Sequence, residues 1–243
     1  MEDPLVKKLS LHGPLSSEEE NALAEAVSEQ RDIGADEEFI SEGSEPSYSI
    51  LLLEGFAARF KYTADGKRQI LSVHVKGDFV DLHSFLLQPM EHGVFSLSPC
   101  TLALAPHHRI REITEGFPHL TRLLWHSTLI DGAIHREWIV NLGCRSAVSR
   151  VAHFLCELFL RLRAVGETQG RSFRLPITQN EMADIAGMSI VHLNRSVQDL
   201  RARRLLSWRG QDVSIDNWDR LSALGDFDPN YLSLPERLIP SGD

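Results

Sequence analysis

Side chains that can hydrogen-bond to the edges of DNA bases recur on one side of a short predicted helix toward the C-terminal end of the chain. Leu193, Val197 and Leu200 follow one another at steps of four and three residues, which predicts a buried face. The opposite face carries amide, guanidinium and small side chains. An Arg guanidinium can bind guanine through two hydrogen bonds, and an Asn or Gln amide can bind adenine in the same way. The expected base-reading residues are Val191, Asn194, Arg195 and Gln198.

Basic and small polar side chains flank this helix and could bind phosphates of the same DNA. Three Arg residues follow at its end, where a guanidinium group adds affinity that does not depend on base sequence. The expected contacts to the DNA backbone are Thr178, Gln179, Ser189, His192, Arg201, Arg203, Arg204 and Arg209.

Charge is distributed unevenly along the chain. The 243 residues carry a formal net charge of −9, but the segment from Leu142 to Gly210 has 11 basic residues, all of them Arg, against five acidic ones. A phosphate backbone meets the local field of such a segment and not the net charge of the chain. A solvated helix surface would explain the excess equally well, so charge alone does not decide for DNA.

The elements that would position these side chains form a helix-turn-helix. Thr178-Gln-Asn-Glu181 is a capping box that opens a short helix, Gly187 ends it, and Ser189 can cap the next helix. The run Leu205 to Ile215 then predicts a two-stranded wing with its turn at residues 209–212. The whole constellation favours DNA binding over two ordinary core helices and a hairpin.

A β-rich region precedes these helices, from about Asp36 to Ala105. Glycines recur there every 10 to 16 residues, and Thr63-Ala-Asp-Gly-Lys67 carries the Asp-Gly signal of a hairpin. The pattern is typical of a small antiparallel barrel or roll.

A long helix is predicted between the two regions, from Pro118 to a break at Gly143. A second amphipathic helix is predicted from Ser146 to Val165. A loop is predicted at residues 166–170. The long helix has an apolar stripe that must be buried, either against a second copy of the chain or against the chain's own β region. The expected dimer seam is Leu123, Ile130, Ile134 and Trp138.

The run from Ile177 to Arg201 resembles the winged helix-turn-helix of the cyclic-AMP receptor protein and FNR family of bacterial transcription regulators. Residues 145–155 resemble the helix after the family's hinge, and Tyr48 to Gly55 with Gly77 to Val80 resemble its β-roll. The resemblance implies an α+β protein with four parts: a cyclic-nucleotide-binding-like β-roll with an N-terminal helix (1–117), a dimerisation helix and hinge (118–143), a winged helix-turn-helix (144–220) and a C-terminal extension (221–243). It also implies a homodimer on a two-fold operator, with RNA polymerase as a further partner.

The chain departs from the family where cyclic AMP would bind. The family's cyclic-nucleotide binders hold the ribose with a Glu and the phosphate with an Arg, and this chain has neither at the corresponding positions. The residues found there form a degenerate effector pocket: Asp81, Leu82, His83, His92, Gly93 and Val94. We therefore expect no control by cyclic AMP in the usual way. The first cysteine is Cys100, so the N-terminal cysteine cluster of the iron–sulfur members is missing. Val191 stands where the family often has Glu. The DNA half-site that family members usually bind is therefore not expected for this chain on the resemblance alone.

The 11 histidines raise a rival function, a metal-dependent β-roll (cupin-like) enzyme or sensor. Such enzymes need a His-x-His or His-x-Asp/Glu pair on one face of a strand. His74 has Ser72 and Lys76 as same-face neighbours, and His107 and His108 are adjacent. No metal, cofactor or catalysis is therefore predicted, and a ligand-binding module without DNA is the third alternative.

Composition limits the remaining classes. No uncharged apolar run approaches the roughly 18 residues of a membrane span, and the acidic N-terminus lacks a signal peptide's pattern. The three scattered cysteines are predicted to be reduced, buried thiols. These features predict a cytoplasmic protein with no membrane partner, whose small-molecule effector the sequence does not identify.

Overall fold

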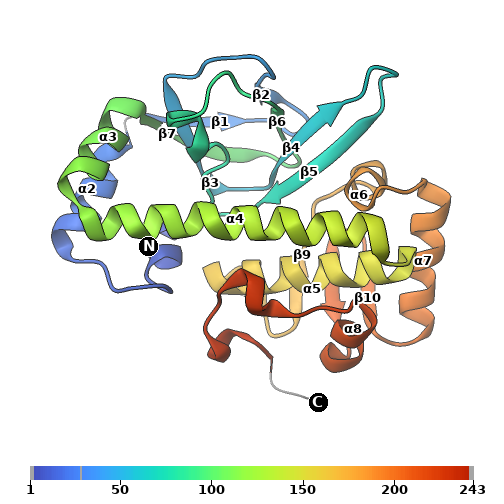
Figure 1. The fold of residues 1–243 in the computed structure, drawn as a ribbon. Helices are drawn as coiled ribbons and strands as arrows, with labels where there is room; N and C mark the ends of the chain where they lie inside the picture. Colours follow the sequence, from blue (N-terminus) through green and yellow to red (C-terminus); the bar gives the residue numbers. More distant parts are fainter. Residues whose placement is uncertain (1–2, 28, 241–243) are drawn as a thin grey trace. The chain divides into compact units, whose positions relative to one another are not determined.

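The computed structural model describes residues 3–27 and 29–240 of the chain (Figure 1). Their contacts divide the chain into two compact units, Met1–Gly132 and Ala133–Asp243. Within the described ranges, no helix combines the length and the apolar character that a membrane crossing requires.

The first unit is built on two sheets. One has the strand order β1-β7-β3 and the other β2-β6-β4-β5, and every pair is antiparallel. The predicted small antiparallel roll is thereby confirmed. Its strands are β1 (Glu29–Ile33), β2 (Glu38–Ile40), β3 (Tyr48–Glu54), β4 (Ala57–Tyr62), β5 (Arg68–His74), β6 (Gly93–Ser96) and β7 (Cys100–Pro106).

The Asp-Gly hairpin between β4 and β5 forms where the sequence predicts it. The backbone amide of Thr63 donates to the carbonyl of Lys67 at 2.9 Å, and Gly66 has a φ of 80°. A residue with a side chain is disfavoured at such a φ, which is why glycine follows Asp65 here.

Short helices cover one side of the roll. They are α1 (Pro4–Leu9), α2 (Ser17–Ala26), the 3-10 turn η1 (Leu82–Phe85) and α3 (His107–Gly116). Leu9, Leu23, Leu51 and Ile113 belong to one buried cluster. The core therefore joins the N-terminal helices to the sheet and to α3.

Two long helices follow, α4 (Pro118–Cys144) and α5 (Ala147–Val165). The predicted break between these helices near Gly143 is confirmed to within one residue, because α4 ends at Cys144. The Ser146 hydroxyl then caps α5 by accepting from the amide of Ser149 at 3.3 Å.

The second unit carries the predicted helix-turn-helix and more strand than the sequence indicates. Residues 166–170 are not only a loop, because Thr168–Gln169 pairs with a strand at Ser172–Arg174, and the sheet has the order β10-β11-β9-β8. Its elements are β8 (Thr168–Gln169), β9 (Ser172–Arg174), α6 (Gln179–Ala186), α7 (Ile190–Ala202), β10 (Leu206–Arg209), β11 (Asp212–Ile215), α8 (Trp218–Leu224) and the 3-10 turns η2 (Pro229–Leu232) and η3 (Glu236–Leu238).

Candidate nucleic-acid interface

The turn between α6 and α7 has the predicted construction. The Thr178 hydroxyl accepts from the amide of Glu181 at 3.2 Å, and the Glu181 carboxylate accepts from the amide of Thr178 at 2.6 Å. Gly187 ends α6 with a φ of 58°, and the Ser189 hydroxyl accepts from the amide of His192 at 3.4 Å. These contacts set the start of α6 and the direction in which α7 leaves the turn.

Arg150 of α5 holds the same turn from the other side, a role that the sequence did not reveal. Its Nη1 donates to the carbonyls of Ala186 and Gly187 at 3.1 and 3.4 Å. These carbonyls lie at the end of α6, where no helical donor follows. Arg150 is therefore a positioning residue within the basic segment and not simply one more surface cation.

The inner face of α7 is buried as the spacing predicts. Leu193 and Leu200 are buried, Val197 is partly buried, and Ser196 is buried with its hydroxyl donating to the carbonyl of His192 at 2.9 Å. Burial of this face leaves the opposite face of α7 turned away from the core of the unit.

The predicted base-reading residues lie on that outward face. Val191 is 60% exposed, and the side chains of Arg195 and Gln198 are exposed and make no hydrogen bond or ion pair among residues 3–27 and 29–240. Asn194 is partly buried, and its Nδ2 donates to Oε1 of Gln179 at 3.4 Å. Arg195 and Gln198 thus have free donors, whereas Asn194 is already tied to the start of α6.

The predicted phosphate-contacting arginines differ in their surroundings. Arg201 donates to the carbonyl of Trp208, and Arg203 pairs with Asp199 at 2.9 Å. Arg204 is exposed just after α7, at a φ of 55°, and Arg209 is exposed at the end of β10. Arg201 therefore connects α7 to the wing, and Arg204 and Arg209 present less engaged guanidinium groups.

The wing is the predicted hairpin of β10 and β11. Arg209 of β10 lies opposite Asp212 of β11 in the register of the two strands, and Gly210 has a φ of 58° in the turn between them. A cavity of about 470 Å³ lies between this wing, α7 and the start of α6. Its lining includes Gln179, Asn194, Gln198, Arg201 and Trp208. The structure thereby brings predicted base-reading and backbone-contacting residues to one hollow.

The C-terminal segment packs on α5. The buried Glu157 carboxylate accepts from Trp138 Nε1 at 3.1 Å, Arg161 Nη1 at 3.1 Å and Tyr231 Oη at 2.8 Å. His153 contacts the same Tyr231 hydroxyl at 3.1 Å, and burial raises the pKa of Tyr231 so that it stays a donor. The predicted extension from residue 221 thus completes the polar network on which α5 rests.

The predicted dimer seam on α4 requires correction. Leu123 belongs to the core of the first unit, Ile134 is 5% exposed, and Trp138 is 5% exposed with its ring against Phe154. Ile130 alone of the four is partly exposed. The stripe that periodicity selected is therefore mostly covered by the chain itself.

A different stripe of α4 faces outward. Its apolar members are Trp125, Leu129, Ile139 and Val140, with exposures of 65%, 54%, 70% and 41%. Trp125 and Leu129 are about one helical turn apart, and Ile139 follows Trp125 by 14 residues, which is close to four full turns. We call this set the outer stripe of α4.

The predicted effector pocket is closed in part by its own side chains. Asp81 is fully buried and accepts from the amide of Ile50 at 2.6 Å, and burial raises its pKa to about 7. Val94 is fully buried in the core, and a Cβ at Gly93 would meet the Phe60 ring at 2.5 Å. Leu82 packs against the core beside α1 and α2.

The two predicted pocket histidines come together. The rings of His83 and His92 lie 5.3 Å apart, and Glu91 stands beside both. Burial and the nearby Arg59 lower the pKa of His92 to about 4, so its imidazole is neutral at pH 7. Arg59 itself is buried, donating to the carbonyl of Val80 at 2.8 Å and to Asp131 of α4 at 2.6 Å.

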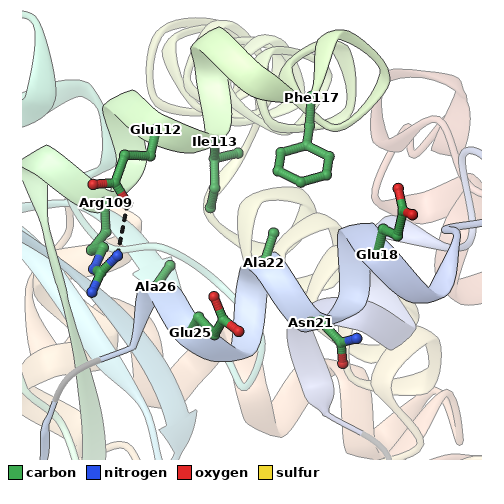
Figure 2. Close-up of a pocket in the computed structure, with 9 residues that line it drawn as sticks. All are labelled: Glu18, Asn21, Ala22, Glu25, Ala26, Arg109, Glu112, Ile113 and Phe117. Atoms are coloured by element: carbon green, nitrogen blue, oxygen red, sulfur yellow. Dashed lines mark hydrogen bonds and ion pairs between the residues drawn. The ribbon is translucent and has the colours of Figure 1, made fainter.

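A separate cavity of about 310 Å³ lies between α2 and α3 (Figure 2). Figure 2 shows Glu18 and Glu25 of α2 and Arg109 of α3 among the lining residues, and Nη1 of Arg109 donates to Glu112 at 2.8 Å. None of the predicted effector residues lines this cavity. Its carboxylates and its ion-paired Arg make it a poor place for a phosphate.

Two family models match the chain. Residues 30–116 match the cyclic nucleotide-binding domain, and residues 149–224 match the Crp-like helix-turn-helix domain. The order of the two matches is that of the β-roll and the winged helix-turn-helix in the structure. The chain belongs to the Crp/Fnr family of transcription regulators.

Relatives of this Crp/Fnr protein include two named activators. The transcriptional activator protein anr of Pseudomonas aeruginosa is 26% identical over 91% of this chain and 88% of its own, and the transcriptional activator protein FnrL of Cereibacter sphaeroides is 26% identical over 84% and 83%. The solved structure of FixK2 from Bradyrhizobium japonicum has a TM-score of 0.74 at 23% identity and covers 82% of this chain and 97% of that one. The predicted fold class is confirmed.

Proposed function

We propose that the chain is a cytoplasmic homodimer that binds a two-fold DNA operator in a sequence-specific manner and regulates transcription from it. The observation that carries the proposal is the outward face of α7, where Arg195 and Gln198 are exposed with free donors opposite the buried Leu193 and Leu200. Side chains on such a face can reach base edges when the helix enters the major groove.

The arginines around α7 supply the second part of the interface. Arg204 and Arg209 are exposed at the end of α7 and on the wing. In this proposal they bind phosphates and set the affinity, while Arg195, Gln198 and Val191 set base preference. Thr178, Gln179, Ser189 and His192 lie at the starts of α6 and α7, where backbone amides and short side chains can meet a phosphate.

Dimerisation is assigned to the outer stripe of α4. Burying the exposed side chains of Trp125, Leu129 and Ile139 is favourable in free energy. A second copy of the chain offers the same stripe around a two-fold axis. The two copies then present two α7 helices to half-sites about 34 Å apart. RNA polymerase is the further partner through which such a dimer would act.

Cyclic AMP is not the proposed effector. Its phosphate and ribose need free polar groups, whereas Asp81 is engaged by the amide of Ile50, Arg59 is paired with Asp131, and Val94 is part of the core. Introducing a buried anion beside a carboxylate is also unfavourable.

Binding selection from random DNA duplexes tests the function. We expect enrichment of a two-fold symmetric site with half-sites one helical turn apart, and loss of binding as salt rises, because bound arginines release counterions. Enrichment of no sequence, or of a site without symmetry, would contradict the proposal. The variant Leu129→Glu serves as a control, since it should weaken binding to the full site and leave the base preference of a half-site unchanged.

A further inference from the structure

Three side chains of the first unit converge at one point although they are not adjacent in sequence. His83 lies in η1, whereas Glu91 and His92 immediately precede β6. The segment between them returns because Met90 is buried and its backbone makes two hydrogen bonds, from the amide of Gly43 at 2.7 Å and to the carbonyl of Ser44 at 2.9 Å. The loop is thereby held to the sheet.

The nitrogen and oxygen atoms of these side chains face one another. Nε2 of His83 lies 3.7 Å from one oxygen of Glu91, and Nε2 of His92 lies 3.7 Å from the other. One ligand atom from each residue lies within 4.8 Å of the others. Two ligands of a tetrahedral ion with bonds of about 2.1 Å lie about 3.4 Å apart, so small side-chain rotations would bring these atoms to coordinating distance.

The His92 ring is oriented as a metal ligand would be. Its Nδ1 lies 3.3 Å from the carbonyl of Gly93, which fixes the proton on that nitrogen and leaves the lone pair on Nε2. Nε2 is shielded from solvent and makes no hydrogen bond within residues 3–27 and 29–240. A buried acceptor without a donor is unfavourable unless another group satisfies it. A cation held by Nε2 would do so.

Charge near the cluster allows a divalent ion. The nearby cation is Arg59, and its charge is balanced by the ion pair with Asp131. Glu91 adds a negative charge within the cluster. The Glu91 carboxylate would therefore offset part of the positive charge of a bound ion.

We propose that His83, Glu91 and His92 form a binding site for a divalent transition-metal ion of the zinc and ferrous iron class. Two imidazoles and a carboxylate suit these ions better than Ca²⁺ or Mg²⁺, which prefer oxygen alone. Three protein ligands leave at least one position for water or a small anion, as in sites that exchange ligands. His74 is not a member, because its Nε2 lies 3.0 Å from the Ser72 hydroxyl and its Nδ1 faces Asp78.

The test is calorimetric titration of the metal-free full-length protein with Zn²⁺. We expect one site per chain with a dissociation constant in the micromolar range or tighter. His92→Ala and Glu91→Gln should each weaken Zn²⁺ binding by about tenfold or more. Replacement by Co²⁺ should give visible absorption bands of a nitrogen- and oxygen-coordinated ion. These readouts do not depend on DNA, so their outcome is independent of the proposed function.

A second histidine pair provides the matched control. The rings of His12 and His126 lie 4.5 Å apart in the same unit. His12→Ala should bind Zn²⁺ as the wild type does. The proposal is overturned if the wild type binds no Zn²⁺ more tightly than about 100 μM, if Glu91→Gln binds like the wild type, or if His12→Ala removes the site. Glu91 is half-exposed, so its variant keeps the test valid if His92→Ala fails to fold.

Discussion

Replacing Ile139 with Glu should dissociate the dimer and leave the monomer folded. Ile139 is 70% exposed on the outer stripe of α4. Complete burial of such a side chain stabilises by about 1.5 to 3 kcal/mol, so covering the exposed part contributes about 1 to 2 kcal/mol per copy. A two-fold interface contains the residue twice, which gives about 2 to 4 kcal/mol, or a roughly 30- to 1000-fold weaker dimer. The buried carboxylates add to this loss.

Sedimentation equilibrium measures the effect over nanomolar to micromolar concentrations, and thermal unfolding reports the fold. Ile134→Glu is the matched control on the same helix, because Ile134 is 5% exposed in the single chain. That variant should lower the melting temperature strongly, since an unpaired carboxylate would enter the core. The reasoning is refuted if Ile139→Glu sediments as the wild type does, or if Ile134→Glu dissociates the dimer at an unchanged melting temperature.

The other predictions concern α7, its turn, the pocket and the pH response. Arg195→Ala should lose about 1 to 3 kcal/mol of binding free energy on the selected duplex and relax base choice. Arg204→Ala should weaken binding to all duplexes alike and lower the slope of log affinity against log salt concentration by about one. Titrations of matched and scrambled duplexes at several salt concentrations measure both effects, and equal losses for Arg195→Ala on the two duplexes would contradict the assignment. Arg150→Ala leaves two turn carbonyls without their donor and should lower the unfolding free energy in urea by about 1 kcal/mol, with Arg209→Ala unchanged. Calorimetry should detect no sub-micromolar cyclic AMP site. Burial lowers the pKa of His74 from 6.5 to about 4, so its contribution to stability is present above pH 6.5 and lost as the pH falls to about 4; urea unfolding should show a flatter profile over this window for His74→Gln.

Local signals in the sequence were sufficient for the helix-turn-helix. The capping box at Thr178, the left-handed Gly187 and the cap at Ser189 act within a few residues of one another, and the structure contains each of them. The same is true of the Asp65-Gly66 hairpin. Such features depend on backbone hydrogen bonds and φ preferences that short segments carry with them.

The dimer stripe shows where periodicity is insufficient. Leu123 and Trp125 are both large apolar residues of α4, yet one is buried and the other is 65% exposed. A helical repeat identifies apolar faces but not which face the chain's own core will cover. Arg150 was missed for a similar reason, since nothing near it in sequence indicates the carbonyls that it contacts 36 residues later.

The sequence by itself determined the family, the order of roll, long helix and winged helix, and the polar face of α7, because these rest on local spacing and residue type. Only the tertiary structure decided that Leu123 and Trp138 are internal, that the segment after Leu224 supports α5, and that His83 meets Glu91 and His92. These outcomes depend on contacts between residues far apart in the chain, whose formation follows from how the whole core closes and not from any short pattern.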